Sequence, residues 1–212
     1  MADGEKVGAE AFLPERLSLP RMREAAAGCR GCHLHQHATQ TVFGEGRRSA
    51  LLMLVGEMPG DREDLAGRPF VGPAGRELDK ALEAVGIDRR EVYVTNVVKH
   101  FKFEERGKRR IHQTPKRPEI DACRPWLDSE IEVVHPRALV LLGATAAKAI
   151  FGSSFTLSRH RGETLPAELA PIVTATIHPS AILRAPSEAR QRERQGFTND
   201  LRAVARALAQ TA

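Results

Sequence analysis

The sequence has little cysteine and no long apolar run, and these two shortages exclude whole classes of protein. Its three cysteines are too few, and odd in number, for the disulfide framework that stabilises many small secreted proteins. No apolar stretch approaches the roughly 20 residues that cross a bilayer, and the first residues lack a basic segment followed by an apolar one. We therefore expect a soluble, cytoplasmic monomer with no membrane partner.

The remaining composition suits one α/β domain. A chain of 212 residues with 42% apolar composition is long enough to bury a sizeable core. Residues 1–20 mix charge, glycine and proline without periodicity, so we expect a flexible segment there and a single domain over residues 21–212. The net charge of +5 favours a polyanionic partner only if the basic residues gather on one face.

Residues 51–75 are the stretch around which we expect the fold to be organised. Residues 51–55 are apolar and predict a strand buried on both faces, and a polar loop rich in glycine and proline follows. Loops at the carboxyl ends of parallel strands hold ligands in α/β proteins. In this loop Glu57 is placed to orient a base or activate water, and Phe70 to form a flat platform for a ring. The alternatives are a solvated carboxylate and a core phenylalanine.

Further apolar runs predict three more strands, and amphipathic segments predict helices between them. The strands are expected at residues 92–98, 138–142 and 171–177, and the helices at residues 74–85, 118–134, 144–152 and 187–208. Because strands and helices alternate, we predict a three-layer α/β/α sandwich with a central, mainly parallel four-stranded sheet. Asn96 and His178 then emerge at the same sheet edge as Glu57. Asn96 offers the donor and acceptor needed to read a base, although such a side chain also ties loops together.

Cys29 and Cys32 form a C-x-x-C within a turn-like segment. Two thiolates at this spacing suit a metal or cluster, but the same pattern fits a redox pair or two surface thiols. If a metal is bound, Cys123 is the third candidate ligand and a histidine is the natural fourth. The candidates for that histidine are His33, His35, His37, His100 and His135.

Residues 101–117 abandon periodicity and are rich in lysine and arginine. This composition predicts a long exposed loop that is suited to phosphate contact. Neighbouring cations tend to keep the imidazole of His112 neutral and nucleophilic, and Glu57 could orient it; the alternative is a solvated histidine in a basic patch. Ser180 and Arg184, after the last predicted strand, suit a phosphate at a helix start or a simple capping turn.

Four segments together resemble the family 4 iron–sulfur uracil-DNA glycosylases. They are GEMPG at residues 56–60, RPFVG at 68–72, VTNVVK at 94–99 and HPSAILR at 178–184. Two departures from family 4 resemble the UdgX branch instead. His100 stands where family 4 usually has a cysteine, and the basic loop that contains KRRIH is an addition.

The resemblance implies a DNA-modifying enzyme with a cofactor. It implies excision of uracil from DNA, including single-stranded DNA, followed by covalent attachment of His112 to the abasic sugar in a single turnover. A 4Fe-4S cluster would be held by Cys29, Cys32, His100 and Cys123. The catalytic residues would be Glu57, His112 and His178; uracil would contact Gly56, Met58, Asp61, Phe70 and Asn96; DNA would contact Lys108, Arg109, Arg110, Ser180 and Arg184.

One position departs from the UdgX pattern. UdgX proteins commonly have glutamine where this chain has Met58. A polar side-chain role is therefore open at this position, although the backbone amide of Met58 remains available to a ligand.

Two other functions stay open from the sequence. In an ordinary glycosylase with multiple turnovers, Glu57 would activate water and His112 would only help to bind DNA. A cluster-bearing module that binds DNA without cleaving it is the other alternative, but the joint presence of Glu57, Asn96 and His178 argues against it. In either enzyme, cytosine would present the wrong hydrogen-bonding groups to Asn96, and the unpaired polar groups would disfavour it.

Overall fold

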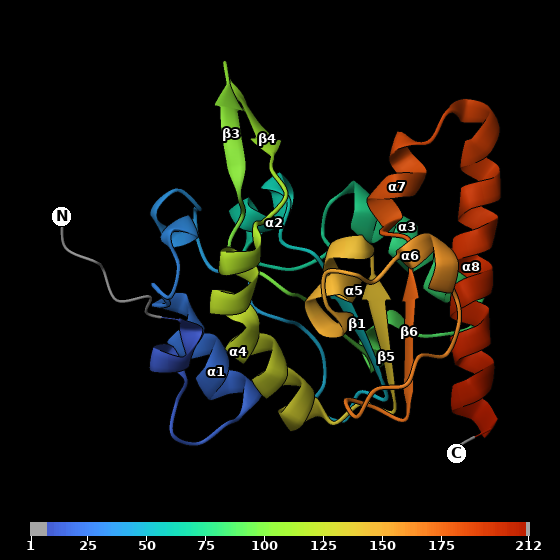
Figure 1. Cartoon of the computed structure of the whole chain (residues 1–212), viewed down its shortest axis with the longest axis horizontal. Coiled ribbons are helices and arrows are strands. Elements are labelled where there is room, and N and C mark those ends of the chain that lie inside the picture. Colours follow the sequence, from blue (N-terminus) through green and yellow to red (C-terminus); the bar gives the residue numbers. More distant parts are fainter. Residues whose placement is uncertain (1–7, 211–212) are drawn as a thin grey trace.

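The computed structural model describes residues 8–210 and contains the four-stranded sheet that the sequence predicts. Its strands are β1 (Leu52–Gly56), β2 (Val92–Asn96), β5 (Ala138–Leu142) and β6 (Ile172–Thr176), in the order β2-β1-β5-β6. Every neighbouring pair is parallel, so the four carboxyl ends lie at one edge (Figure 1). The predicted parallel sheet is confirmed.

Helices cover both faces of this sheet (Figure 1). They are α1 (Leu19–Ala27), α2 (Asp61–Ala66), α3 (Pro73–Ala84), α4 (Arg117–Val134), α5 (Ala144–Phe151), α6 (Leu157–His160), α7 (Pro179–Arg184) and α8 (Ser187–Gln210), with short 3-10 helices η1 (Ala9–Phe12), η2 (His33–Gln36) and η3 (Arg89–Glu91). On β1, Met53 and Val55 pack with α1, α4 and α5, whereas Leu52 and Leu54 pack with α3 and α8. Both strand faces are therefore apolar, and the predicted three-layer arrangement is confirmed.

The basic segment predicted to be an exposed loop contains an antiparallel hairpin, which projects from the rest of the molecule in Figure 1. Its strands are β3 (Phe103–Arg106) and β4 (Arg109–His112). Gly107, with a φ of 61°, allows the tight turn between them. The strands have only four residues each, and their mostly exposed side chains show no burial pattern that would reveal them in the sequence.

Two other segments are more helical than the sequence suggests. The loop rich in glycine and proline after β1 contains α2, whose first turn is acidic, as favours a helix start. Near the N-terminus, η1 packs against α4 and its Ala9 is buried. Of the segment expected to be flexible, residues 1–7 lie outside the described residues. Among residues 8–210, no helix is long and apolar enough to cross a membrane.

A buried ion pair lies behind the end of β2. Lys99 Nζ is 2.5 Å from Oε2 of Glu130 on α4, and both side chains are almost completely buried. Lys99 also donates to Thr95 Oγ1 and to the Asn96 carbonyl, each at 2.6 Å. Glu130 in turn accepts a hydrogen bond from the Tyr93 hydroxyl. All three ammonium donors are used, so the pair is well satisfied and holds the end of β2 against α4.

Breaking this pair should destabilise the protein strongly. We expect Lys99→Met to lower the free energy of unfolding by about 3 to 5 kcal/mol, because it leaves the Glu130 carboxylate buried without its cation. Lys99→Met combined with Glu130→Gln should recover part of this loss, since a neutral amide still accepts the Tyr93 hydrogen bond. Urea unfolding measures both effects, and a loss below about 1 kcal/mol in the single variant would contradict this assignment.

Candidate functional site

Polar side chains from all four strand ends meet at the carboxyl edge of the sheet. Glu57 follows β1, Asn96 ends β2, Thr145 lies in the first turn of α5 after β5, and His178 follows β6. The strands are parallel, so these positions lie at the same edge. His112 reaches the same place from the end of the hairpin.

Glu57 connects the sheet edge to the hairpin. Its Oε1 is 3.2 Å from His112 Nε2, and its Oε2 accepts a short hydrogen bond from the Thr145 hydroxyl. Oε1 is buried and receives no hydrogen bond of good geometry from residues 8–210, so the approach of His112 is a close polar contact. Burial, the largest influence, raises the pKa of Glu57, but His112, Thr145 and His178 together bring it below its ordinary value. Glu57 is therefore ionised at neutral pH.

His178 is held as a neutral imidazole with its proton on Nε2. The Ser180 backbone N–H donates to Nδ1 at 3.2 Å, and the Ser180 hydroxyl oxygen is 2.7 Å from the same nitrogen. Arg184 donates to that hydroxyl oxygen at 2.9 Å, which leaves the hydroxyl proton for His178. Burial lowers the pKa of His178 to about 4, although Glu57 opposes this. The Nε2–H group is thus a donor for a carbonyl oxygen.

Phe70, Gly56 and Asn96 form a compact group beside His178. The rings of Phe70 and His178 stack with their centroids 6.1 Å apart. A Cβ on Gly56 would lie 2.8 Å from the tip of the Phe70 ring and would collide with Asn96 Oδ1. Only glycine fits at this close approach of ring and amide. The structure therefore brings together three of the five residues expected to bind uracil.

The other two residues expected to bind uracil have different surroundings. Met58 is 6% exposed, and its side chain belongs to the core on the α4 side of the sheet. This thioether packs among apolar side chains, which gives position 58 no polar side-chain role. Asp61 begins α2, and its carboxylate pairs with Arg110 at 2.7 Å.

Arg110 fastens the hairpin to α2. Its guanidinium is 2.6 Å from the fully buried Asp64 and also pairs with Asp61. The same group lies over the rings of Phe101 and Phe103, 5.4 and 5.0 Å from their centroids. Arg110 was expected from the sequence to contact DNA, but these contacts occupy its side chain within the protein.

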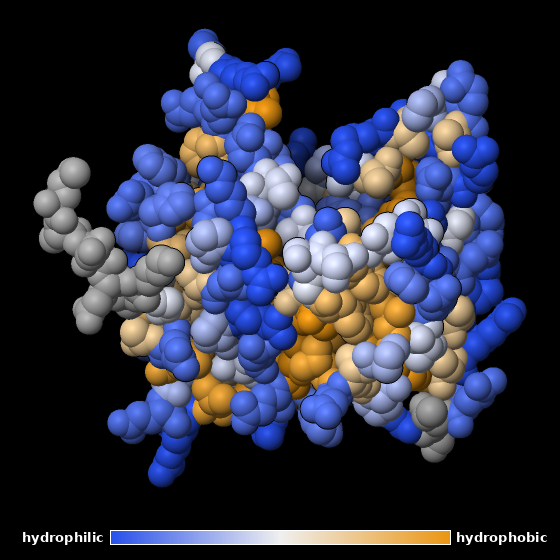
Figure 2. All heavy atoms as spheres, viewed as in Figure 1, coloured by the Kyte–Doolittle hydropathy of each residue, from blue (hydrophilic) through white to orange (hydrophobic). Residues whose placement is uncertain are grey.

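The two rims of the site carry exposed side chains. Figure 2 shows the surface hollowed between the hairpin and the end of the molecule formed by α7 and α8, with mostly hydrophilic atoms on both rims. Lys108 and Arg109 are exposed at the hairpin tip, and Arg184 is exposed on α7. Leu183, next to Arg184, is 37% exposed. Leu183 is therefore an exposed apolar side chain on the same helix as Arg184.

The three cysteines are free and lie near one another. Lys99 donates its backbone N–H to Cys123 Sγ at 3.2 Å, and Trp126 donates Nε1–H to Cys29 Sγ at 3.3 Å. Burial chiefly raises the pKa of Cys123 to about 12, and the proximity of Cys32 and Cys29 adds to this. Sulfurs that accept N–H bonds resemble those around an iron–sulfur cluster, so the donor chemistry fits one.

The ligand set is not assembled as a closed metal site. Within residues 8–210, no three histidine, cysteine, aspartate or glutamate side chains converge closely enough to hold a metal ion. Position nevertheless narrows the choice of histidine. His135 ends α4, roughly 18 Å along the helix axis from Cys123. His100 is buried and directly follows the residue whose N–H contacts Cys123, while His35 is a near neighbour of His100.

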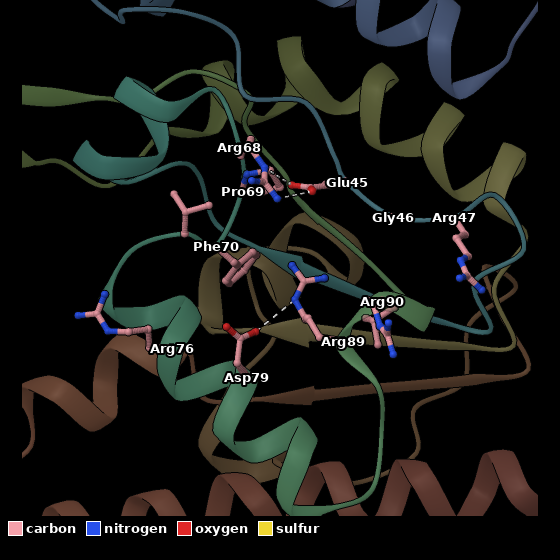
Figure 3. A pocket seen from close by; sticks show the side chains of 12 residues that line it. Glu45, Gly46, Arg47, Arg68, Pro69, Phe70, Arg76, Asp79, Arg89 and Arg90 are labelled. Atoms are coloured by element: carbon pink, nitrogen blue, oxygen red, sulfur yellow. Dashed lines mark hydrogen bonds and ion pairs between the residues drawn. The ribbon is translucent and has the colours of Figure 1, made fainter.

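A pocket of about 520 Å³ lies beside the candidate site, next to β2, which is an outer strand of the sheet (Figure 3). Phe70 and five arginines contribute to its lining, whereas the polar residues at the strand ends do not. Figure 3 shows Arg68 bonded to Glu45 and Arg89 to Asp79. Two of the five arginines are thus paired with carboxylates that also line the pocket, and the pocket meets the candidate site only at Phe70.

Three features of the site are not evident from the sequence. Thr145 follows the end of a predicted strand, as Glu57 does. This position is the sequence feature from which its place in the site could have been predicted. The pairing of Arg110 with Asp64 joins segments far apart in the sequence, so no local pattern reveals it. Leu183 lies within a short helical segment in which spacing alone does not distinguish an exposed leucine from a buried one.

Comparison with known proteins shows which family the chain belongs to. The chain is 36% identical to a type-4 uracil-DNA glycosylase of Pyrobaculum aerophilum over 178 residues, which cover 81% of this chain and 87% of the relative. Type-4 uracil-DNA glycosylases of Sulfurisphaera tokodaii and Thermotoga maritima are 39% and 38% identical, over 80% and 76% of this chain and 78% and 81% of their own. The family model of the uracil DNA glycosylase superfamily matches residues 43–202, which include all four strands and the hairpin, and the chain therefore belongs to this superfamily.

Proposed function

We propose that this protein excises uracil from DNA and that His112 then becomes covalently bound to the abasic sugar. The observation that carries the proposal is the position of His112 Nε2, 3.2 Å from Glu57, at the sheet edge where Asn96 and His178 also lie. Relatives named as uracil-DNA glycosylases support the excision of uracil. The covalent step goes beyond those names and depends on the hairpin that carries His112.

Recognition of uracil would use the compact group around Gly56. A uracil turned out of the DNA stack would lie against the Phe70 ring, and the Asn96 amide would bond to its donor and acceptor edge. Asn96 is only 3% exposed, so a base with the wrong hydrogen-bonding pattern would leave buried polar groups unpaired. This requirement gives a physical reason for rejecting cytosine.

Breaking the N-glycosidic bond moves charge in two directions. The bonding electron pair leaves with uracil, and the Nε2–H of His178 stabilises the negative charge that develops on a uracil oxygen. The sugar gains oxocarbenium character at C1′, which the negative charge of Glu57 favours. Glu57 is ionised and would face the positive sugar, whereas His178 is neutral with an N–H that would face the negative uracil. The two side chains thus match the charges of the two fragments.

The covalent bond would then form at C1′. The unprotonated ring nitrogen of a neutral His112 imidazole attacks this carbon, while the proton is on Nε2, the nitrogen that lies 3.2 Å from Glu57. The resulting imidazolium gives this Nε2 proton to Glu57, which releases it to solvent. The uracil anion takes a proton from solvent, so the products are neutral uracil and a sugar linked to histidine. To break the new carbon–nitrogen bond, the neutral imidazole of His112 would have to leave, and it is not easily displaced. The adduct should therefore persist.

The rims would position the DNA. Lys108, Arg109 and Arg184 are exposed and would contact phosphates, while Leu183 could fill the space vacated by the flipped base. Such contacts involve mostly the sugar–phosphate backbone, which suits single-stranded as well as double-stranded DNA. Ser180 contributes indirectly in this arrangement, because its hydroxyl links Arg184 to His178.

We also propose a 4Fe-4S cluster held by Cys29, Cys32, Cys123 and His100. The free thiols and the N–H groups directed at two of their sulfurs support this ligand set. When bound, the cluster would supply a structural cross-link between the segment before β1, the end of β2 and α4. Retention of the fold, rather than a step in bond cleavage, is the role we assign to it.

The covalent step predicts a complex that survives denaturation. Wild-type protein mixed with a uracil-containing oligonucleotide should give a band resistant to SDS and heat, because a carbon–nitrogen bond persists where electrostatic contacts do not. A thymine oligonucleotide is the control and should give no such band. Mass spectrometry of the digested complex should place the nucleotide on the peptide that contains His112, and attachment elsewhere would overturn the assignment.

Replacing His112 distinguishes the covalent reaction from ordinary hydrolysis. Within the described part of the chain, Glu57 Oε1 receives no well-formed hydrogen bond, so it is free to hold a water once His112 is removed, which is the observation in favour of an ordinary glycosylase. His112→Ser should abolish the resistant complex and release uracil over multiple turnovers, since water replaces the imidazole. Multiple turnover by the wild type without any adduct would support the ordinary glycosylase instead.

The environment of His178 predicts a pH dependence of stability. Its pKa is about 4 in the folded protein, below the ordinary value of 6.5, so the unfolded chain takes up a proton first as the pH falls. Stability should therefore be lost between pH 6.5 and about 4, by up to roughly 1.4 kcal/mol per pH unit from this group. Urea unfolding should show a shallower pH dependence for His178→Gln, and equal slopes would contradict the assigned environment.

The cluster assignment predicts the metal content of two variants. The wild type should be isolated brown with about four irons per chain. His100→Ala should lower iron retention because one of four ligands is lost, whereas His35→Ala, which removes a neighbouring histidine, should retain it. Iron analysis and visible absorbance measure this directly, and the reverse result in the two variants would replace His100 by His35 in the ligand set.

A further inference from the structure

Phe70 has an unusual backbone conformation for a residue with a side chain. Its φ is 57°, in the left-handed region that disfavours residues other than glycine. Only 8% of the residue is exposed. Such a conformation costs energy and persists only where the surroundings enforce it. The contacts around Phe70 come from α2 and from the first turn of α3.

Glu63 of α2 provides one of those contacts. Its Oε1 accepts a hydrogen bond from the Gly72 backbone N–H at 2.7 Å, and the Glu63 side chain is buried. Gly72 is the N-cap of α3 and lies just beyond Phe70, so the carboxylate also faces the positive end of a helix of 12 residues. The hydrogen bond therefore fixes the peptide that leads from Phe70 into α3.

The first turn of α3 supplies a second constraint. A Cβ on Gly75 would collide with the Phe70 carbonyl oxygen, so this turn packs directly against the strained residue. Figure 3 shows Phe70 between the Arg68–Pro69 side of the loop and α3. With its backbone held from both directions, Phe70 directs its ring tip toward Gly56.

Glu63 differs from the other carboxylates of this loop in its partner. Glu57 lies beside His112, and Asp61 and Asp64 pair with Arg110. Among residues 8–210, Glu63 makes no ion pair, and its described hydrogen bond goes to the Gly72 N–H. A buried carboxylate directed at backbone next to a strained aromatic residue is well placed to determine the position of that ring.

We propose that Glu63 is a positioning residue that holds Phe70 in place as the stacking platform for the flipped base. This inference rests on the proposed function, because it assigns the ring a uracil ligand. Loss of the carboxylate should let residues 70–72 relax toward an ordinary φ and should move the ring away from Gly56. Glu63 itself would touch neither uracil nor DNA.

A double-mutant cycle between Glu63 and Phe70 tests the proposal. The assay is uracil release from a uracil-containing single-stranded oligonucleotide, measured as kcat/KM in the His112→Ser background so that turnover continues. Phe70→Ala should lower kcat/KM by about 5-fold to 150-fold, the loss expected for one stacked base. Glu63→Ala should cause a large part of the same loss, but it should have little further effect when Phe70 is already alanine.

Two variants control for a general loss of structure. Glu63→Gln keeps an acceptor for the Gly72 N–H, so only the interaction of the charge with the helix dipole is lost. Its kcat/KM should therefore remain within about fivefold of that of the parent. Glu77→Ala removes another buried carboxylate, on α3, whose partner is Arg194 of α8. It should lower stability without reproducing the non-additive effect with Phe70→Ala.

The outcomes separate this inference from the proposed function. If the parent releases uracil but Glu63→Ala and Phe70→Ala reduce kcat/KM by independent factors that multiply, Glu63 is merely structural and the inference is wrong. Full activity of Glu63→Ala would also overturn it. If neither the wild type nor the His112→Ser parent releases uracil, the proposed function fails first, and the role assigned to Phe70 fails with it.

Discussion

The buried carboxylate of Asp64 imposes the constraint on which the candidate site depends. A fully buried charge requires a partner, and Arg110 provides it at 2.6 Å. Arg110 belongs to β4 of the hairpin, which forms a sheet separate from the central one, so this contact fixes an element that the central sheet does not hold. His112 lies two positions further along the same strand and on the same face, which directs it to Glu57. The position of His112 beside Glu57 thus follows from an ion pair between two other residues.

The acidic loop after β1 illustrates how one composition can serve several roles. A cluster of carboxylates near a phosphate-binding surface would normally repel the ligand. Here Arg110 compensates Asp61 and Asp64, and Glu63 faces the positive end of α3. Glu57 is the acid of this loop whose charge faces the hollow next to His112. The loop can therefore be rich in acid while most of its charge is compensated within the protein.

The parts of this arrangement that follow from the sequence are those with a simple burial pattern. Each strand of the central sheet is buried and contributes apolar residues to both faces, and the parallel order places Glu57, Asn96 and His178 at the same end of the sheet. The hairpin has no such pattern because its short strands are mostly exposed. The role of Arg110 is equally hidden, since an arginine in a basic segment fits a phosphate as well as a carboxylate. Only the fold, by bringing α2 beside β4, decides between them.

Lys99 joins the region of the three thiols to the end of the second strand of the sheet. Its backbone N–H bonds to the sulfur of Cys123, and its ammonium bonds to the carbonyl of Asn96. A displacement of that sulfur, by oxidation or by loss of a bound metal, would pull on the residue that anchors the end of β2. The thiol region and the backbone of Asn96 are therefore mechanically linked through a single residue, so that damage at the thiols would be transmitted to the end of the second strand of the sheet.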